Sequence, residues 1–218
     1  SSVVVLHAGS SDGSCSVLPG CATRKYHSSR RDAFKPINQE PIAHVKIGPD
    51  GPSIEMGDAV GFDARPEAIS PMMFDESTRI AQFIADAHLH SDLVEAAIDA
   101  DYDALLFHGT GLGHLPIADP QDDSPENTRL RIMLADHCAA GGVVVVVTQA
   151  IHGPVHMDVY DKGRDQQEMG IIGHGSLCPP SSALVKLHHL LSRDEGRDAV
   201  GEGWEQDLLG ENPPDALS

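Results

Sequence analysis

Hydrophobic residues in the first fifty positions occur in short runs separated by segments rich in Gly, Ser and Pro. The runs at Val3–Leu6, Cys15–Leu18 and Ile42–Ile47 each have the length of a short β-strand, and turn-forming residues stand between them. Pro49-Asp50-Gly51-Pro52 is expected to form a turn, because Pro fixes φ and Gly accepts positive φ. We therefore predict short strands joined by loops in this part of the chain.

From residue 78 onward, apolar runs alternate with amphipathic segments. Strands are predicted at Arg79–Ile84, which we expect to be buried, and at Ala104–Phe107, Val143–Val147 and Ile171–Ile172; helices are predicted over 91–100, 125–140, 161–169 and 180–191. Ser91 and Ser124 are candidate N-caps, and Gly141 and Gly170 are candidate helix stops. Five consecutive Val residues favour a parallel strand covered on both faces. The alternation predicts βαβ units and a small doubly wound sheet.

Composition divides the chain into four segments. Residues 1–47 hold the first strands, residues 48–77 are predicted to be a linker rich in Pro and Gly, and residues 78–192 hold the alternating strands and helices. Residues 193–218 turn to Asp, Glu, Gly and Pro and are expected to form a disordered acidic tail, in which Trp204 is either a docking anchor or exposed. The apolar run at the start, with no Met before it, predicts a strand cut from a longer chain.

The chain carries a formal net charge of -18, with 22 Asp against 11 Glu and 10 Arg against 5 Lys. Such a surface repels nucleic acid, whose binding depends on Lys and Arg that neutralise phosphates. The charge is explained either by solubility or by adaptation to a salt-rich cytoplasm, where the Debye length falls to about 3 Å at 1 M salt. The low Lys and high Asp content favours the second interpretation, so we expect a halophilic source.

No segment predicts a membrane span, a disulfide or a metal site. No apolar run approaches the roughly 18 residues of a spanning helix, and no charged region precedes the first strand as in a signal peptide; we expect a cytoplasmic protein without a membrane partner. The cysteines, Cys15, Cys21, Cys138 and Cys178, form no Cys-x-x-Cys pair. The paired histidines, His88 with His90 and His188 with His189, have no Cys or carboxylate at a metal-binding spacing.

Basic residues are concentrated between Arg24 and Lys35, and by composition this segment is a solvated turn. It also resembles the Arg-x-Arg-Lys-Met-His-Thr-Ser-Arg-Arg-Asp-x-Phe segment of the asparaginase-type amidase domain in archaeal glutamyl-tRNA(Gln) amidotransferase D subunits. The shared residues are Arg24, Lys25, His27, Ser29, Arg30, Arg31, Asp32 and Phe34, and Ile37-Asn38 with Pro41-Ile42-Ala43 continue the match. Tyr26 and Ser28 are modest departures from the family's pattern.

The resemblance implies that Lys25 is a catalytic residue. In that family a Thr near the N-terminus attacks a side-chain amide, and a second Thr, an Asp and a Lys handle the protons. A Lys serves this role when burial or neighbouring cations lower its pKa. The family's Thr-Gly-Gly-Thr-Ile and Gly-Thr-Asp-Thr motifs do not occur in this sequence, so Lys25 is expected to mark half of an active site.

A glycine-rich motif, Gly109-Thr110-Gly111-Leu112-Gly113-His114, follows a predicted strand. Dinucleotide-binding loops have closely spaced Gly in this place, but here the third Gly comes two positions after the second instead of three, and Pro116 and Pro120 follow. The amidotransferase family has the same motif, and asparaginases have a close relative of it, ending in Asn, near the active site of a neighbouring subunit. The resemblance implies that His114 contacts substrate bound by another protomer; a structural His that caps the loop is the alternative.

A third stretch, Thr148–Tyr160 followed by Gly163-Arg164-Asp165, also resembles the family, and Ala183–Leu187 matches its last helix. Ala150 replaces the family's Cys. Pro154 replaces the Arg that follows Gly in the family, which removes a charge and a backbone donor. Most of these residues are expected to be structural, and the matches together reach from residue 1 to about residue 192.

The fold that the resemblance implies is α/β, the C-terminal part of an asparaginase-like fold. Residues 78–192 are expected to be its small doubly wound C-terminal domain, and residues 1–47 a remnant of the larger N-terminal α/β domain. The implied function is that of the amidase subunit of a tRNA-dependent amidotransferase, which releases ammonia from glutamine or asparagine. The chain by itself is expected to be inactive.

The resemblance also implies partners. An E subunit would use ATP and Mg to convert Glu-tRNA(Gln) to Gln-tRNA(Gln), so this chain is expected to hold no cofactor and to meet tRNA only through that partner. A homodimer of the amidase subunit is the default expectation. Two alternatives stay open: a free-standing L-asparaginase that hydrolyses asparagine to aspartate and ammonia, and a non-catalytic interaction module.

Overall fold

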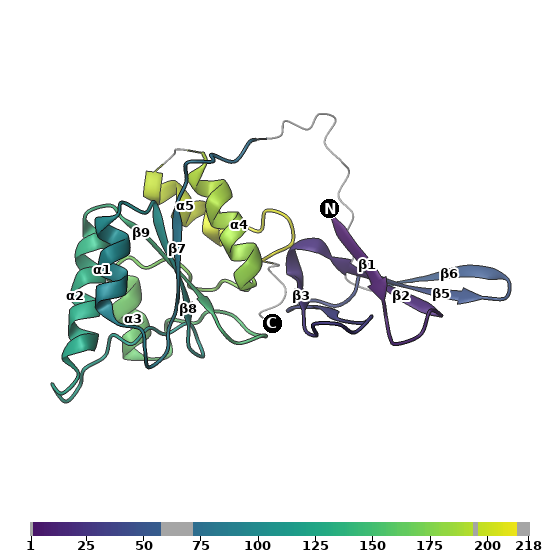
Figure 1. Cartoon of the computed structure of the whole chain (residues 1–218), viewed down its shortest axis with the longest axis horizontal. Helices are drawn as coiled ribbons and strands as arrows, with labels where there is room; N and C mark the ends of the chain where they lie inside the picture. Colours follow the sequence, from purple (N-terminus) through teal and green to yellow (C-terminus); the bar gives the residue numbers. More distant parts are fainter. Residues whose placement is uncertain (1, 58–71, 194–195, 213–218) are drawn as a thin grey trace. The chain divides into compact units, whose positions relative to one another are not determined.

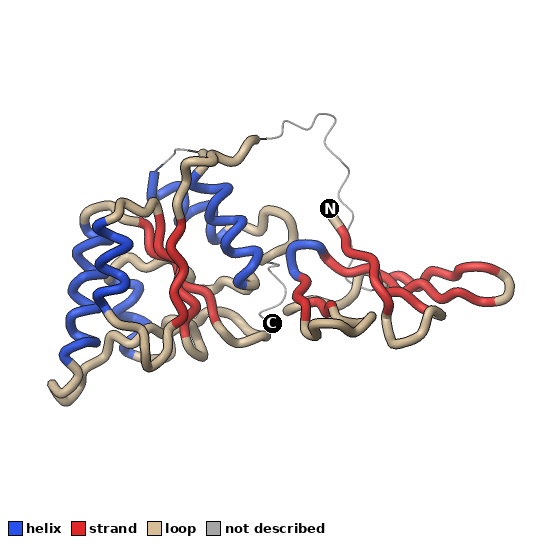
Figure 2. Tube along the Cα trace, viewed as in Figure 1, coloured by secondary structure: helices blue, strands red, loops and turns tan. Residues whose placement is uncertain are grey.

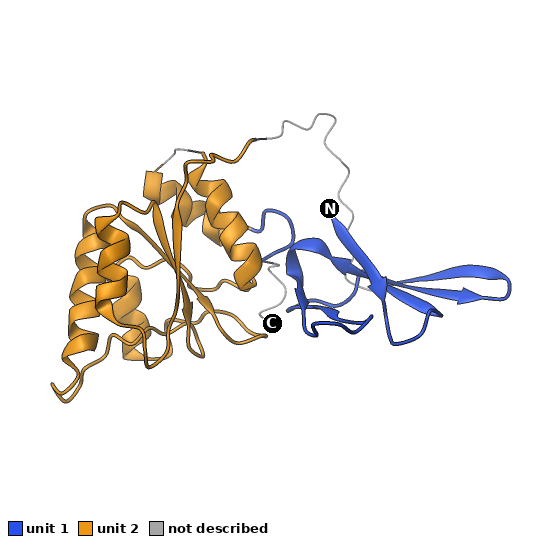
Figure 3. Cartoon of the chain, in the orientation of Figure 1, with its two compact units in different colours: residues 1–72, 207–218 blue, residues 73–206 orange. Residues whose placement is uncertain are grey.

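The chain folds into two compact units. A computed structural model describes residues 2–57, 72–193 and 196–212. The first unit consists of residues 1–72 together with 207–218, and the second of residues 73–206 (Figure 3). The segment after residue 206 therefore belongs with the first unit, although it follows the second in sequence.

The first unit is built on antiparallel strands (Figure 1). Its main sheet has the order β1-β2-β5-β6, formed by Val3–His7, Ser14–Pro19, Ala43–Gly48 and Gly51–Met56. A short 3-10 helix, Gly20–Ala22, leads into a separate hairpin of β3 (Thr23–Lys25) and β4 (Phe34–Pro36). The three strands predicted in this part of the chain are confirmed.

The predicted linker begins with a strand. Gly48 pairs with Gly51 across a turn at Pro49-Asp50, and Gly51 has a φ of 108°, the conformation that favours Gly. The turn prediction is confirmed, but β6 (Gly51–Met56) occupies residues that we had predicted to be linker. Every β6 side chain is exposed, so the strand lacks the alternation of buried and exposed positions that identifies strands in sequence. Residues 58–71 of that linker lie outside the described part of the chain.

The second unit has a parallel three-stranded sheet, and helices lie on both of its faces (Figures 1 and 2). The strands are β7 (Ile80–Ile84), β8 (Ala104–Gly109) and β9 (Val143–Thr148), in that order. The helices are α1 (Ser91–Asp99), α2 (Pro125–Ala139), α3 (Asp161–Glu168), α4 (Pro180–Leu191) and α5 (Gly196–Glu205). In Figure 1, α1, α2 and α3 lie on one side of the sheet and α4 and α5 on the other. All six residues of β9 are buried, which confirms the prediction from its run of Val.

Several local predictions need correction. Strand β7 is an edge strand, and Ile84 is 60% exposed, so it is not the buried strand that its apolar residues indicated. The predicted strand at Ile171–Ile172 is a single bridge between Ile172 and Val145. The N-cap of α1 is His90 rather than Ser91, and the Glu126 carboxylate of α2 accepts the Ser91 N–H. An anion in that position is favoured because unpaired N–H groups lie at a helix N-terminus.

The predicted helix stops at Gly141 and Gly170 are confirmed. Gly141 follows the C-cap of α2 with a φ of 94°, and Gly170 follows the C-cap of α3 with a φ of 85°. Both are in the left-handed conformation that commonly ends helices. None of the helices in the described part of the chain has the combination of length and apolar character that crossing a bilayer requires.

The prediction of a disordered tail is wrong for residues 196–212. Trp204 on α5 is 1% exposed, and the buried Lys186 ammonium of α4 donates to the carbonyls of Trp204, at 2.9 Å, and of Gln206. Gly203 lets α5 approach α4 closely, since a Cβ there would lie 2.5 Å from Leu190 Cδ2. The polar composition of this segment indicates disorder, but one large buried aromatic side chain and a buried cation are enough to anchor the helix. Residues 213–218 of the predicted tail lie outside the described residues.

We predict that Trp204→Ala lowers the free energy of unfolding of the second unit by about 3 kcal/mol or more, because truncating a buried aromatic side chain leaves a cavity. Chemical denaturation followed by far-UV circular dichroism measures this change. Val185→Ala on α4 is the matched control, because Val185 is mostly exposed and its truncation should cost about 0.5 kcal/mol or less. A Trp204→Ala protein as stable as this control would show that α5 does not anchor the unit.

Candidate functional site

Lys25 is the last residue of β3 and is exposed. It pairs across the hairpin with Phe34, and its Nζ lies 5.7 Å from the centroid of the Phe34 ring. A cation placed over an aromatic face is attracted by the ring's quadrupole. The hairpin therefore fixes where the Lys25 side chain starts and places its ammonium beside an aromatic ring, while the residue stays exposed.

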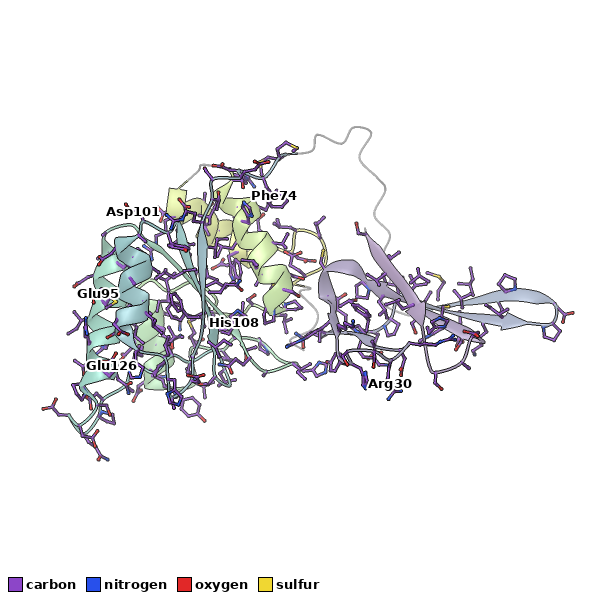
Figure 4. All side chains as sticks on the ribbon, in the orientation of Figure 1. Arg30, Phe74, Glu95, Asp101, His108 and Glu126 are labelled. Atoms are coloured by element: carbon purple, nitrogen blue, oxygen red, sulfur yellow. The ribbon has the colours of Figure 1, made fainter. Side chains whose placement is uncertain are left out.

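The loop that joins β3 to β4 is ordered by its own side chains. His27 Nδ1 accepts the N–H groups of Ser29 and Arg30, each at 3.1 Å. Arg30, labelled in Figure 4, donates from Nε and from a terminal nitrogen to the two carboxylate oxygens of Asp32, each at 2.8 Å. Such bidentate pairs have a defined geometry, so the segment is more than a disordered basic turn.

The Asp32 carboxylate forms ion pairs with two basic side chains, Arg30 and Lys35. Its side chain is only 11% exposed, and Lys35 Nζ lies 3.8 Å from it in addition to Arg30. The hydrogen bonds from Arg30 are the main cause that holds the pKa of Asp32 below its ordinary value. Arg31 pairs with Asp12 instead. Among the described residues Lys25 has no carboxylate within ion-pair distance, so it differs from Arg30, Arg31 and Lys35.

The glycine-rich motif forms a closed loop at the carboxyl end of β8. Thr110 and His114 form a bridge in which each N–H donates to the other's carbonyl at 2.9 Å. Gly111 and Gly113 have φ of 51° and 93°, and a Cβ on Gly109 would lie 2.5 Å from the backbone of Gly113. The N–H groups of Gly113 and His114 both donate to Thr110. They are thus not available to bind a phosphate, which argues against the dinucleotide-binding interpretation.

Gln166 on α3 holds this loop from inside the unit. Its side chain is fully buried; Oε1 accepts the Leu115 N–H at 2.8 Å, and Nε2 donates to the Gly113 carbonyl at 3.0 Å. A second support comes from Thr148 at the end of β9, whose hydroxyl donates to the Gly111 carbonyl. Sequence reasoning missed Gln166, because a polar residue in a polar helix gives no sign that it faces inward.

His114 lies against Tyr160 within the second unit. The His114 side chain is only 5% exposed, its ring meets the Tyr160 ring edge to face at a centroid distance of 5.5 Å, and its Nε2 is enclosed without a hydrogen-bond partner among the described residues. Burial lowers the pKa of His114, and the nearby Lys162 cation lowers it further. His114 is therefore biased to the neutral imidazole. Both interpretations of His114, as a substrate contact and as a structural residue, stay predictions.

His188 contacts residues near the start of the second unit, and the cysteines are thiols. His188 shares a hydrogen bond between its Nε2 and the Asp75 carbonyl at 2.9 Å and lies beside the Phe74 ring. All four cysteines lie in the described part of the chain, and none of them is in a disulfide. Lys25 belongs to the first unit and His114 to the second.

Comparison with known proteins places these features in context. The sequence profile of the Glutaminase/Asparaginase C-terminal domain matches residues 79–202. The glutamyl-tRNA(Gln) amidotransferase D subunit of Methanosarcina mazei is 34% identical over 96% of this chain and 44% of its own length. Its counterpart of the same name in Thermococcus kodakarensis is 32% identical over 97% of this chain and 44% of its own length. The chain thus spans less than half the length of these curated relatives.

Solved structures give the same picture of the fold. L-asparaginase I from Vibrio cholerae superimposes with a TM-score of 0.73 at 25% identity, covering 91% of this chain and 55% of that protein. The thermostable L-asparaginase from Thermococcus kodakarensis superimposes with a TM-score of 0.74 at 23% identity, covering 92% of this chain and 56% of that protein. These matches confirm the predicted asparaginase-like α/β fold and the resemblance that the Lys25 and Gly109–His114 segments indicated.

We predict that Gln166→Leu destabilises the second unit by about 2–4 kcal/mol, since it leaves the Leu115 N–H and the Gly113 carbonyl buried without partners, at about 1–3 kcal/mol each. Denaturant titration measures the loss. The matched control is Gln167→Leu, which removes only an exposed hydrogen bond to Asp158. Equal stability of the two variants would contradict the role of Gln166.

The lowered pKa of His114 makes stability depend on pH in a defined direction. A base whose folded-state pKa is depressed stabilises the fold fully above its unfolded pKa, about 6.5, and loses this contribution as pH falls toward the folded value. We expect the stability difference between wild type and His114→Asn to shrink as pH falls from about 8 to about 5. Burial also lowers the pKa of His137, but this contribution is common to both proteins and cancels. A difference that is constant over this range would contradict the prediction.

Proposed function

We propose, because the chain belongs to the Glutaminase/Asparaginase C-terminal domain family, that it is part of an amidase that releases ammonia from the side-chain amide of glutamine or asparagine. Its curated relatives are named as D subunits of glutamyl-tRNA(Gln) amidotransferase. By that similarity the ammonia serves the conversion of Glu-tRNA(Gln) to Gln-tRNA(Gln). Since the chain spans less than half of those relatives, the activity is proposed for a longer protein that contains it.

The observation that carries this proposal is the state of Lys25. Three basic residues that follow Lys25 are paired with carboxylates: Arg30 of the loop and Lys35 of β4 with Asp32, and Arg31 of the loop with Asp12. Lys25 instead has only the Phe34 ring beside it among the described contacts. A lysine that is held in place but left without a carboxylate can meet other proton-handling groups.

The chemistry assigned to Lys25 is proton transfer and charge stabilisation. A Thr hydroxyl is a weak nucleophile and needs a positioned group that accepts its proton or stabilises the charge that forms. Lys25 would support a Thr, a second Thr and an Asp that are supplied outside these 218 residues, because the family's Thr motifs do not occur in this sequence. The surroundings that enclose the Lys25 ammonium must come from the same residues, since the side chain is exposed here.

Partners follow from the same similarity. We propose that an E subunit uses ATP and Mg to activate Glu-tRNA(Gln) and receives the ammonia, and that the amidase subunits pair as a homodimer in the cytoplasm. The net charge of -18 supports leaving tRNA binding to the partner, because phosphate binding needs a positive surface. In a homodimer His114 would contact substrate held by the neighbouring protomer.

A free-standing L-asparaginase is the second candidate, favoured by the structural similarity to the Vibrio cholerae enzyme. The asparaginase and the amidotransferase hypotheses differ in whether amide hydrolysis depends on a partner subunit and tRNA. Amide hydrolysis by the longer protein that is unaffected by an added E subunit and tRNA would support the asparaginase, and stimulation by both would support the amidotransferase.

We predict that the coding sequence upstream of the Ser1 codon contains the two Thr motifs, and that Lys25→Met in the longer protein reduces ammonia release by about 10²- to 10⁴-fold, as expected for a lost proton-transfer group. Circular dichroism should show an unchanged fold. Lys35→Met on the adjacent strand is the matched control and should retain most activity. A stop codon before any Thr motif, or near-normal activity of Lys25→Met, would refute the assignment.

A further inference from the structure

The second unit contains a cluster of metal-ligating side chains that the proposed amidase chemistry does not use. His156, Asp158 and His174 each offer one ligand atom, and these atoms all lie within 4.8 Å of one another. His156 and Asp158 come from the segment between β9 and α3, and His174 from the segment between α3 and α4. The cluster was not visible in the sequence because His174 stands sixteen positions after Asp158, far from any metal-binding spacing.

We propose that His156, Asp158 and His174 bind one divalent transition-metal ion, with Zn²⁺ as the best match. Two imidazoles and one carboxylate suit Zn²⁺ and its neighbours rather than Mg²⁺ or Ca²⁺, which prefer sets of oxygen ligands. Three protein ligands leave a fourth position for water.

One distance in the cluster matches that of a tetrahedral site. Nε2 of His174 lies 3.4 Å from Oδ2 of Asp158, and ligands at about 2.0–2.1 Å from a tetrahedral Zn²⁺ are separated by about 3.3–3.4 Å. The rings of His156 and His174 meet edge to face at a centroid distance of 5.4 Å. All the ligand atoms lie within 4.8 Å of one another, so the two imidazoles and the carboxylate can face a single ion.

The surroundings hold the ligands and leave an entry path. Gln167 Nε2 donates to Oδ1 of Asp158 at 2.8 Å, which orients the carboxylate as supporting residues do in metal sites. The side chains of His174 and Asp158 are 40% and 61% exposed, so an ion can reach them.

One ring nitrogen of His156 is buried without a partner in the described part of the chain. Nδ1 of His156 is enclosed and has no hydrogen-bond partner among the described residues. Buried polar atoms are usually paired, and an ion or a water that completes the site is one explanation for an exception.

Metal binding would break the hydrogen bond between the Met157 N–H and the His174 ring. Nδ1 of His174 accepts the Met157 N–H at 3.1 Å, so without metal the neutral ring carries its proton on Nε2, beside Asp158. An ion at Nε2 moves that proton to Nδ1, which then no longer accepts the Met157 N–H. We therefore expect a modest affinity, and faster hydrogen exchange at the Met157 amide in the bound state.

The ion would link the segment before α3 to the segment after it, and the first of these also bonds to the glycine-rich loop. The Val155 N–H donates to Ser176 and the Gly175 N–H donates to Val155, at 2.9 and 2.8 Å, while the His156 N–H donates to the Leu112 carbonyl at 2.9 Å. Coordination would add a side-chain link to these backbone bonds, so the site acts as a structural clamp.

The test is calorimetric titration of the 218-residue chain, first treated with a chelator, with Zn²⁺ and with Co²⁺ as the spectroscopic probe. We expect one tightest site per chain. His156→Ala and His174→Ala should weaken it by about 100-fold or more, and Asp158→Asn and Gln167→Leu by about 10- to 100-fold, the range typical of lost supporting residues. His152→Ala is the matched control, an exposed histidine of the same segment, and should leave the affinity unchanged.

Absence of Zn²⁺ binding in the wild type, or equal affinity in His174→Ala and wild type, would overturn the proposal. Should His156→Ala fail to fold, His174→Ala and Asp158→Asn, which alter exposed side chains, provide the same comparison. Hydrogen exchange gives a second readout: the Met157 amide should exchange faster with Zn²⁺ bound, and the Val155 amide should not.

Discussion

Two side-chain amides at the carboxyl-terminal edge of the parallel sheet, those of the exposed Gln149 and the buried Gln166, hold the candidate site of the second unit together. Gln149 donates from Nε2 to the carbonyls of Ala85 and His108, at 2.8 and 2.7 Å, which joins the ends of β7 and β8; His108 is labelled in Figure 4. Gln166 fixes the glycine-rich loop from α3 in the same way. The Gln149 amide adds a side-chain link between carbonyls at the ends of β7 and β8, and the Gln166 amide pairs with buried backbone groups of the loop, which need partners when they are removed from water. The position of His114 depends on this network.

In the first unit, several positively charged side chains lie close together in the hairpin that carries Lys25. The Asp32 carboxylate pairs with Arg30 of the loop and Lys35 of β4, and His27 accepts the N–H groups of Ser29 and Arg30. The hairpin register places Lys25 opposite Phe34. Lys25 is thus held by β-pairing and by one aromatic contact, which leaves its ammonium accessible to groups from elsewhere in the proposed longer protein.

Sequence reasoning succeeded where one local signal dominates. The run of Val predicted β9, and Gly141 and Gly170 marked the ends of two helices, because each depends on burial or on positive φ at a single position. It failed where packing between distant residues decides the structure: β6 pairs with β5 and has only exposed side chains, and α5 is held by the burial of Trp204 and by Lys186. Gln166 and the His156–Asp158–His174 cluster were missed for the same reason, since neither has a characteristic spacing. The motifs at Lys25 and Gly109–His114 identified the family but not the surroundings of either residue.

The central claim is that these 218 residues contribute Lys25 to an amidase active site whose nucleophile lies outside them. Ammonia release from glutamine and from asparagine by the purified 218-residue chain tests this most directly. We expect no release above the enzyme-free blank from either amide, in a protein whose circular dichroism shows a folded state. Catalytic turnover of either amide by the chain alone would contradict the claim, because the nucleophile would then have to be one of the residues present.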